Sequence, residues 1–411
     1  MSDGTSEEQS ARQPESAAPQ LSIGVPKETF PDEIRVALVP DLVPQYVKAG
    51  FDVCVETDAG LRAGFTDDSF VKKGAKIYPN RRELFEECEV ILQVRSFGAN
   101  PESGRADLAL MRKGQIIIGH FEPLSEPALM NELAATGVKA FGIELLPRIT
   151  RAQSMDALSS MATVGGYKAV VLAASHLPMM FPMLMTAAGT VSPARVLIVG
   201  AGVAGLQAIA TAKRLGAKVS AYDIRPAVKE QVESLGAKFV EMDLGADDAE
   251  DKGGYAKAMD EEFYKRQREL MTRVIAESNV VITTAAVPGK KAPILVTEHM
   301  VEHMMPGSVI VDLAAERGGN CELTKAGETI VHDHVTILGP INLPATIPYH
   351  ASQMYGRNLL SFVRNFMKDG RIDMNHEDEI VRDTMLTNDG EVVNARVREL
   401  LDTSPTERSD G

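Results

Sequence analysis

The chain has 411 residues, the length of two or three domains, and 44% hydrophobic and 24% charged residues are typical of a globular protein with a sizeable core. The formal net charge of −14 argues against nucleic acid or an anionic membrane surface as the main partner, because both attract basic surfaces. Three widely spaced cysteines, Cys54, Cys88 and Cys321, form no CxxC motif, so we expect a reducing compartment.

The N-terminus and one apolar stretch bear on targeting. Residues 1–20 are polar and predict a disordered leader rather than a secretory signal. Between Ala169 and Ala194 no residue is charged, which is long enough to cross a bilayer. Pro178 and Pro182 interrupt this stretch and no second candidate span accompanies it. We therefore interpret it as a buried helix followed by a buried connector in a soluble chain.

Strand patterns in the first half alternate with helical ones. A helix is expected over residues 41–50, ending at Gly50. Apolar runs predict strands at 21–28, 51–57, 90–95, 114–121 and 139–145. Strands that alternate with helices indicate a parallel sheet covered on both faces.

The second half repeats this pattern more regularly. Six strands are predicted at 195–200, 218–223, 238–243, 279–285, 308–314 and 335–339. Six strands in βα alternation favour a doubly wound dinucleotide-binding fold. The acidic insertion at 244–270 contains Gly253 and Gly254 and predicts an exposed mobile loop before a helix. An amphipathic helix at 351–367 is expected to pack back on the first domain.

These patterns predict an α/β protein with two Rossmann-like domains, whose parallel sheets flank a cleft and of which the first is discontinuous. The expected division is a disordered leader (1–20), an N-terminal Rossmann-like domain (21–160 plus 345–385), a NAD-binding Rossmann domain (161–344) and a polar C-terminal tail (386–411).

A glycine fingerprint opens the second domain. Gly200, Gly202 and Gly205 form a GxGxxG motif, with Val203 and Ala204 between the last two, after an apolar strand and before a helix. In such a motif the first glycine permits a tight turn, the second lets a pyrophosphate approach the backbone, and the third lets helix and strand pack closely. The phosphates then lie on free amides at the positive end of the helix. The alternative is a glycine-rich turn without nucleotide.

The next strand ends in Asp223, followed by Ile224 and Arg225. A carboxylate at this point accepts the hydroxyls of the adenosine ribose and repels a 2′-phosphate, which favours NAD over NADP. Arg225 leaves the alternative open, because a nearby arginine can hold a 2′-phosphate.

A polar segment at 147–160 precedes the second domain and carries Arg148, Gln153, Asp156 and Ser159. Arg148 and Asp156 have the charges to pair, and the Gln153 side chain can both donate to and accept from a carboxamide such as that of nicotinamide. The alternative is a helix N-terminus, capped by Thr150 or Ser154 with Asp156 near the helix dipole.

Two further features carry weaker signals. His332 and His334 place two imidazoles two residues apart, but no other Cys or His motif supplies ligands, so a solvated turn is favoured and no metal site is predicted. Cys321 is interpreted as a buried, unreactive thiol.

Taken together, several motifs resemble the alanine dehydrogenase and transhydrogenase family. GVPKE and RVALVP, at 24–28 and 35–40, resemble that family broadly. A narrower resemblance, to the soluble NAD(H)-binding alpha component of proton-translocating NAD(P) transhydrogenases, rests on PRITRAQSMDALSS, GAGVAGLQAIATAKRLGA, GGYAKAM, TTAAVPGK and VDLAAERGGNCELT.

The resemblance implies a homodimer that binds NAD(H) in the cleft, a beta subunit that binds NADP(H), and a membrane-spanning component for the protons, so that the chain is cytoplasmic and peripheral to the membrane through its partners. Hydride passes directly between the two nicotinamide rings, so that no general acid is required. The implied residues near the nicotinamide are Arg148, Gln153, Asp156 and Ser159. Those implied elsewhere at the NAD(H) site are Tyr255 and Met259 of a closing loop, with Thr284 and Ala285.

The sequence departs from the family pattern in two respects, and alternative functions therefore stay open. The chain ends in a polar tail, so membrane spans that follow this region in some relatives must belong to another polypeptide. His120 lies where alanine dehydrogenases carry a catalytic histidine, but the lysine that binds the keto-acid carboxylate in them is missing, since Gln93 and Arg95 occupy that strand. We interpret His120 as a buried, hydrogen-bonded residue. An alanine dehydrogenase-like enzyme and a non-catalytic NAD-sensing module remain the alternatives.

Overall fold

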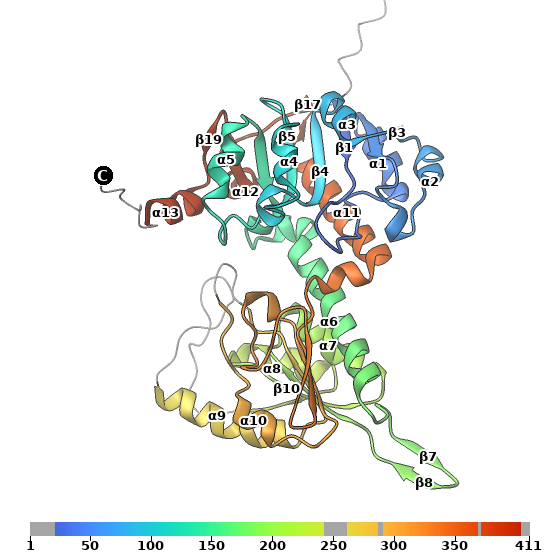
Figure 1. Ribbon diagram of the computed structural model, residues 1–411, viewed down its shortest axis with the longest axis vertical. Coiled ribbons are helices and arrows are strands. Elements are labelled where there is room, and N and C mark those ends of the chain that lie inside the picture. The colour runs from blue at the N-terminus through green and yellow to red at the C-terminus, as the bar shows by residue number, and fades with distance from the viewer. Residues whose placement is uncertain (1–20, 242–260, 287–290, 369–370, 404–411) are drawn as a thin grey trace, which may run out of the picture.

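The computed structural model describes residues 21–241, 261–286, 291–368 and 371–403. Two large sheets form two α/β bodies, which Figure 1 shows one above the other. The expected leader, residues 244–260 of the acidic insertion with Tyr255 and Met259, and the last eight residues lie outside the described ranges.

The first sheet has the strand order β19-β18-β6-β5-β4-β1-β2-β3. Its parallel strands are β1 (Leu21–Val25), β2 (Phe51–Glu56), β3 (Lys76–Tyr78), β4 (Val90–Arg95), β5 (Ile116–His120) and β6 (Lys139–Gly142). Its α-helices are α1 (Val43–Lys48), α2 (Asp67–Val71), α3 (Arg81–Glu87), α4 (Arg105–Leu108), α5 (Leu129–Ala135), α11 (Pro348–Asn365), α12 (Glu379–Thr384) and α13 (Ala395–Thr403). Read from β3 to β6, these strands have the order 3-2-1-4-5-6 of a doubly wound fold.

The second sheet has the order β11-β10-β9-β12-β13-β15-β14. Its strands are β9 (Arg195–Val199), β10 (Lys218–Tyr222), β11 (Lys238–Phe239), β12 (Val280–Thr283), β13 (Val309–Asp312), β14 (Thr329–His332) and β15 (Val335–Leu338). Its helices are α7 (Val203–Arg214), α8 (Lys229–Ser234), α9 (Glu261–Ala276) and α10 (Glu298–Glu302). All strands but β14 are parallel in the same 3-2-1-4-5-6 order, and β14 pairs antiparallel at the edge. The predicted α/β class with two parallel-rich, Rossmann-like sheets is confirmed.

Both sheets are buried on both faces. Along β4, Val90 and Leu92 belong to one apolar core and Ile91 to the other. Along β9, Val196 and Leu197 likewise alternate between two cores. Parallel sheets need this double cover, which is why their strands are continuous apolar runs.

One long helix joins the two bodies. α6 (Ala157–His176) buries its first turns, including Met161 and Val164, in a core of the first body, and its later turns, including Ala169 and Val170, in a core of the second. α6 is the one described helix long and apolar enough to cross a membrane, but it packs against α7 and α11, and core helices pass the same length and composition test. The first part of the predicted buried helix is therefore a core element.

The expected buried connector after this helix is wrong. Strands β7 (Leu184–Thr186) and β8 (Gly189–Val191) form a separate antiparallel hairpin that projects from the second body (Figure 1), and every residue of both strands is exposed. Met185 as a whole residue is 79% exposed. Low charge suggested burial, but the prolines end the helix and the apolar residues after them face outward.

The C-terminal segment also differs from the expected polar tail. Strands β18 (Met385–Asn388) and β19 (Glu391–Val392) extend the first sheet, and α13 follows them. Leu386 and Val397 are fully buried in a core of the first body. The Thr387 hydroxyl donates to the Val138 carbonyl at 2.9 Å, so the antiparallel pairing with β6 is reinforced by a side chain. Local patterns give no signal for this segment, because its partner strand lies about 245 residues earlier in the sequence.

Candidate functional site

The fingerprint glycines form the turn between β9 and α7. Gly200 has φ +100°, a left-handed conformation that glycine adopts without strain. A Cβ on Gly205 would lie 1.9 Å from the Gly200 carbonyl oxygen, so this position requires glycine for helix and strand to meet. A Cβ on Gly202 would meet no atom within 4 Å, which leaves open space at the start of the helix. No described side chain caps α7, whose first amides are therefore available to an anion.

A close helix contact supports this turn. A Cβ on Gly166 of α6 would lie 2.1 Å from the Ala204 carbonyl oxygen, so α6 and α7 approach at backbone distance beside the fingerprint. The sequence reasoning did not identify this contact. The Gly165–Gly166 pair in an otherwise helical run was its signal, because glycine inside a helix is costly unless a neighbour needs the space.

Asp223 follows β10, next to the fingerprint turn. Its carboxylate accepts from the Ala201 amide at 2.7 Å and from the Arg225 amide at 2.9 Å. The Arg225 guanidinium also pairs with it at 3.0 Å. The structure thus holds the predicted acid against the predicted glycine turn, and Arg225 is engaged with that acid.

Thr284 and Ala285 come directly after β12, the strand beside β9. The Thr284 hydroxyl donates to the Gly200 carbonyl at 3.0 Å, so this segment lies against the fingerprint. The carboxyl ends of β9 and β12 meet where the strand order reverses, the place at which doubly wound sheets bind ligands.

A buried polar network, which sequence reasoning missed, holds the Ala285 segment. The Asn320 side chain accepts from the Ala285 amide at 3.0 Å and donates to the Ala285 carbonyl at 2.8 Å. The fully buried Asp312 carboxylate in turn accepts from the Asn320 and Cys321 amides at 2.7 and 2.9 Å. Burial raises the pKa of the Cys321 thiol to about 11, as an unreactive thiol requires.

The polar segment at 147–160 forms the start of α6. Asp156 is the N-cap: its carboxylate accepts from the Ser159 amide at 2.8 Å and from the Ser159 hydroxyl at 2.5 Å. No ion pair joins Arg148 to Asp156 among the described residues, so the suggested pair is not observed, and the Asp156 carboxylate contacts the helix end instead. Arg148 and Gln153 lie before the helix, and the exposed Gln153 belongs to the 3-10 turn Thr150–Met155.

The helix α6 connects the two groups of predicted residues. Ser159 and Gly166 are seven residues apart on α6, an axial separation of about 10 Å, and Gly166 touches the fingerprint helix. The polar segment and the fingerprint are thus connected by two turns of one rigid element. Polar contacts also join the two bodies where Arg317 pairs with Glu122 at 3.3 Å and Asn342 donates to Glu33 at 3.0 Å.

His120 ends β5 in the first body. Its side chain is 13% exposed, with Nδ1 3.6 Å from a Glu144 carboxylate oxygen and its ring beside Tyr355. Gln93 is occupied internally, since it donates to Asp107 at 3.0 Å and accepts from Ser96 at 2.9 Å. The place of the missing lysine is thus filled by a side chain committed to the core.

Comparison with known proteins agrees with this geometry. Residues 24–165 match the family described as alanine dehydrogenase/PNT, N-terminal domain, and residues 169–395 match alanine dehydrogenase/PNT, C-terminal domain. The first segment of the divided NAD(P) transhydrogenase subunit alpha of Rhodospirillum rubrum is 46% identical over 376 residues, which cover 91% of this chain and 98% of that protein.

Two further relatives extend the comparison. The crystal structure of transhydrogenase from Sinorhizobium meliloti matches with a TM-score of 0.82 and 42% identity, over 90% of this chain and all of that one. Alanine dehydrogenase of Bacillus subtilis is more distant, at 30% identity over 80% of this chain and 81% of its own length.

Proposed function

The chain belongs to the alanine dehydrogenase/PNT family of NAD-binding oxidoreductases, and we propose that it is the NAD(H)-binding catalytic subunit of a membrane NAD(P) transhydrogenase. In this proposal hydride passes directly between NAD(H) on this chain and NADP(H) on a partner subunit, coupled to proton translocation. The observation that carries the proposal is the similarity over 98% of a transhydrogenase alpha polypeptide, together with a single GxGxxG motif in the sequence. A single fingerprint supports one dinucleotide site per chain, so in this proposal the second nucleotide is bound by a partner subunit.

The chain's residues fit NAD(H) at the fingerprint. Bound NADH supplies the hydride from its nicotinamide ring. The open space at Gly202 and the uncapped amides of α7 suit the pyrophosphate, and the Asp223 carboxylate suits the ribose hydroxyls. With Arg225 engaged by Asp223, the acid dominates and NAD is favoured over NADP.

The other predicted site residues are proposed to contribute through their position around NAD(H). Thr284 and Ala285, fixed by the Gly200 and Asn320 contacts, border the same end of the sheet. Arg148, Gln153, Asp156 and Ser159 are proposed to border the nicotinamide, with Asp156 and Ser159 rigid through the cap and the exposed Gln153 reaching toward the partner's nucleotide. Tyr255 and Met259 are proposed to close over NAD(H). For direct hydride transfer the protein's contribution is orientation and exclusion of water.

We propose a homodimer with the β7–β8 hairpin in its interface. An isolated two-stranded hairpin is marginally stable in water, and this one exposes Met183, Leu184 and Met185. Membrane spans and the NADP(H)-binding beta subunit are supplied by partner chains in this proposal, and the chain lies at the cytoplasmic face of the membrane. Sedimentation of the wild type and of Met185→Glu tests the dimer, which is expected to dissociate in the variant.

Reconstitution tests the function. The purified chain is mixed with an NADP(H)-binding transhydrogenase component, and hydride transfer from NADH to an NADP⁺ analogue is followed by absorbance; transfer is expected. His120→Gln serves as a control with unchanged transfer. A parallel reaction with NADH, pyruvate and ammonia is expected to be silent, and turnover there would favour an alanine dehydrogenase. Tight NADH binding without any transfer would favour a sensing module.

A further inference from the structure

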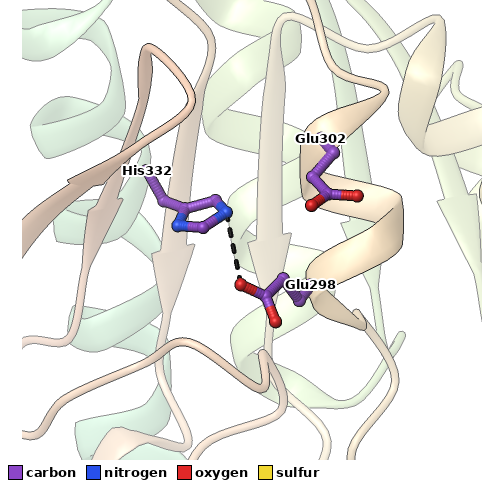
Figure 2. A group of neighbouring side chains, drawn as sticks. All are labelled: Glu298, Glu302 and His332. Carbon is purple, nitrogen blue, oxygen red and sulfur yellow. Dashed lines mark ion pairs between the residues drawn. The ribbon is translucent and has the colours of Figure 1, made fainter.

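Three metal-ligating side chains converge at the outer edge of the second body, away from the dinucleotide site. Glu298 and Glu302 come from α10, and His332 comes from the edge strand β14 (Figure 2). One carboxylate oxygen of each glutamate and one ring nitrogen of the histidine all lie within 4.8 Å of one another. Figure 2 shows the His332 ring between the strand and the helix, directed at Glu298.

The charges of this group are unbalanced. Glu298 and Glu302 are four residues apart, which places them on one helix face, where like charges destabilise a helix. Their ion-pair partners are histidines, His332 at 3.4 Å and His299 at 3.7 Å, and within the described ranges neither pairs with lysine or arginine. A third carboxylate, that of Glu322, accepts the Glu298 amide at 3.0 Å. A divalent cation would neutralise the two facing carboxylates.

The distance between His332 and Glu298 suits a transition metal. Zinc binds carboxylate oxygen and imidazole nitrogen at about 2.0–2.2 Å, so two ligand atoms in a tetrahedral site lie about 3.4 Å apart. The Nε2 atom of His332 is 3.4 Å from the Glu298 oxygen. Imidazole favours zinc, copper, iron and nickel over magnesium and calcium, and the partial exposure of all three side chains leaves room for water as a fourth ligand.

We propose that Glu298, Glu302 and His332 bind one divalent transition-metal ion, with Zn²⁺ as the preferred species. The ion ties α10 to β14, the edge strand of the second sheet, whose outer backbone groups lack a neighbouring strand. The His332–His334 pair did not predict this site, because the partners of His332 are carboxylates that no cysteine or histidine motif reveals. His334 instead lies in the turn after β14, with φ +64°.

Zinc titration of the whole chain tests the site. The protein is stripped with a chelator, any purification tag is removed, and ZnCl₂ is added in a calorimeter. One Zn²⁺ per chain is expected, together with a rise in the thermal unfolding midpoint. Glu298→Gln and His332→Asn are each expected to weaken binding at least about tenfold and to abolish the rise. His334→Asn is the matched control and is expected to bind as the wild type does.

Two outcomes overturn the proposal. One is zinc binding that is unchanged in His332→Asn and Glu298→Gln. The other is binding that depends on His299, since His299 and His303 also face each other on this segment with rings 4.3 Å apart. NADH affinity is measured for each variant as a test of the fold, and it is expected to stay constant because these side chains do not border the fingerprint.

Discussion

The two sheets share one topology but differ at the point where their strand order reverses. In the second sheet this point, between β9 and β12, carries glycine turns and open space at Gly202. In the first sheet, between β1 and β4, the Glu28 carboxylate accepts the Val94 and Arg95 amides at 2.6 and 3.1 Å. At this point the first sheet therefore satisfies backbone amides with the Glu28 carboxyl group. In the second sheet Asp223 accepts the Ala201 amide, but the first amides of α7 stay uncapped and are left for a ligand. A common fold places the site, but the side chains decide whether it is open.

The neighbourhood of Glu28 strengthens this contrast. Glu33 and Arg35 form a buried ion pair, and the charge of Arg35 helps to lower the pKa of Glu33 to about 2 against the opposing effect of burial. Arg95 stacks on Phe30 with 4.3 Å between guanidinium and ring centre. Charged side chains that pair with one another thus lie near the point where the strand order of the first sheet reverses.

The largest effect is expected when a side chain is added at the glycine turn of the second sheet. Gly205→Ala would place a methyl 1.9 Å from the Gly200 oxygen, so we expect a loss of about 1–3 kcal/mol in the free energy of unfolding and loss of NADH binding. Gly202→Ala meets no atom, so we expect near-normal stability with at least about tenfold weaker NADH binding. Denaturant unfolding and fluorescence titration measure both. Equal NADH affinity in Gly202→Ala and wild type would contradict the proposal that the pyrophosphate binds at this turn.

Gln153 tests the proposed nicotinamide end. Gln153→Asn withdraws the carboxamide by one methylene, and a misplacement of this size costs about 100-fold in rate, with little effect on an exposed side chain's contribution to NADH affinity. Stopped-flow hydride transfer and NADH titration separate the two effects. Ser154→Ala, in the same turn, is the control, since the Ser154 contact to Asn358 uses its backbone carbonyl. Normal transfer with lost affinity would contradict the assigned role.

Asp223 tests the choice of nucleotide. Asp223→Asn removes the charge that is proposed to accept the ribose hydroxyls and to repel a 2′-phosphate, so we expect about tenfold weaker NADH binding and a relative gain for NADPH. Parallel titrations with the two nucleotides measure the ratio. Arg225→Gln keeps the acid and is expected to preserve the preference for NADH, so an NADPH gain there would assign selectivity to the arginine instead.

The smallest effect is expected at Glu28, at the corresponding point of the first sheet. Burial, reinforced by the charge of Glu33, raises the pKa of Glu28 to about 7. The folded chain then holds a proton that the unfolded chain releases above pH 4.5, so stability falls as pH rises from about 4.5 to 7. Glu28→Gln is expected to flatten this dependence by about 1–3 kcal/mol across the window. Denaturant unfolding at pH 5 and pH 8 measures it, and parallel slopes for both proteins would refute the assignment.

Elements of the fold that one short, continuous segment of sequence reveals could be predicted. Most of the parallel strands are continuous apolar runs, and the fingerprint with Asp223 spans 24 residues, so both could be recognised before the structure was known. The parallel strand β3 was missed, because it has only three residues and begins with an exposed lysine. Strands β14, β18 and β19 were missed because they pair antiparallel at sheet edges and are short or polar.

The site was predicted less completely for the same reason. Asn320 supports Ala285 from 35 residues away and Asp312 supports Asn320 across a turn, so no motif joins them. The alternative interpretation of the polar segment at 147–160 as a helix start is confirmed, but the cap is Asp156 itself and not Thr150 or Ser154. The expected pairing of Asp156 with Arg148 depended on side-chain direction, which composition does not give.

The helix α6, which both bodies share, sets the distance between two parts of the candidate site. Because one unbroken helix is anchored in the cores of both bodies, its rise of 1.5 Å per residue sets the interval between the Asp156 cap and the Gly166 contact. Inserting or deleting one residue in this interval would also rotate its two ends by about 100° relative to each other. The pitch of this one helix thus fixes both the spacing and the relative orientation of its two ends, so the interval between residues 156 and 166 tolerates substitutions far better than changes in length.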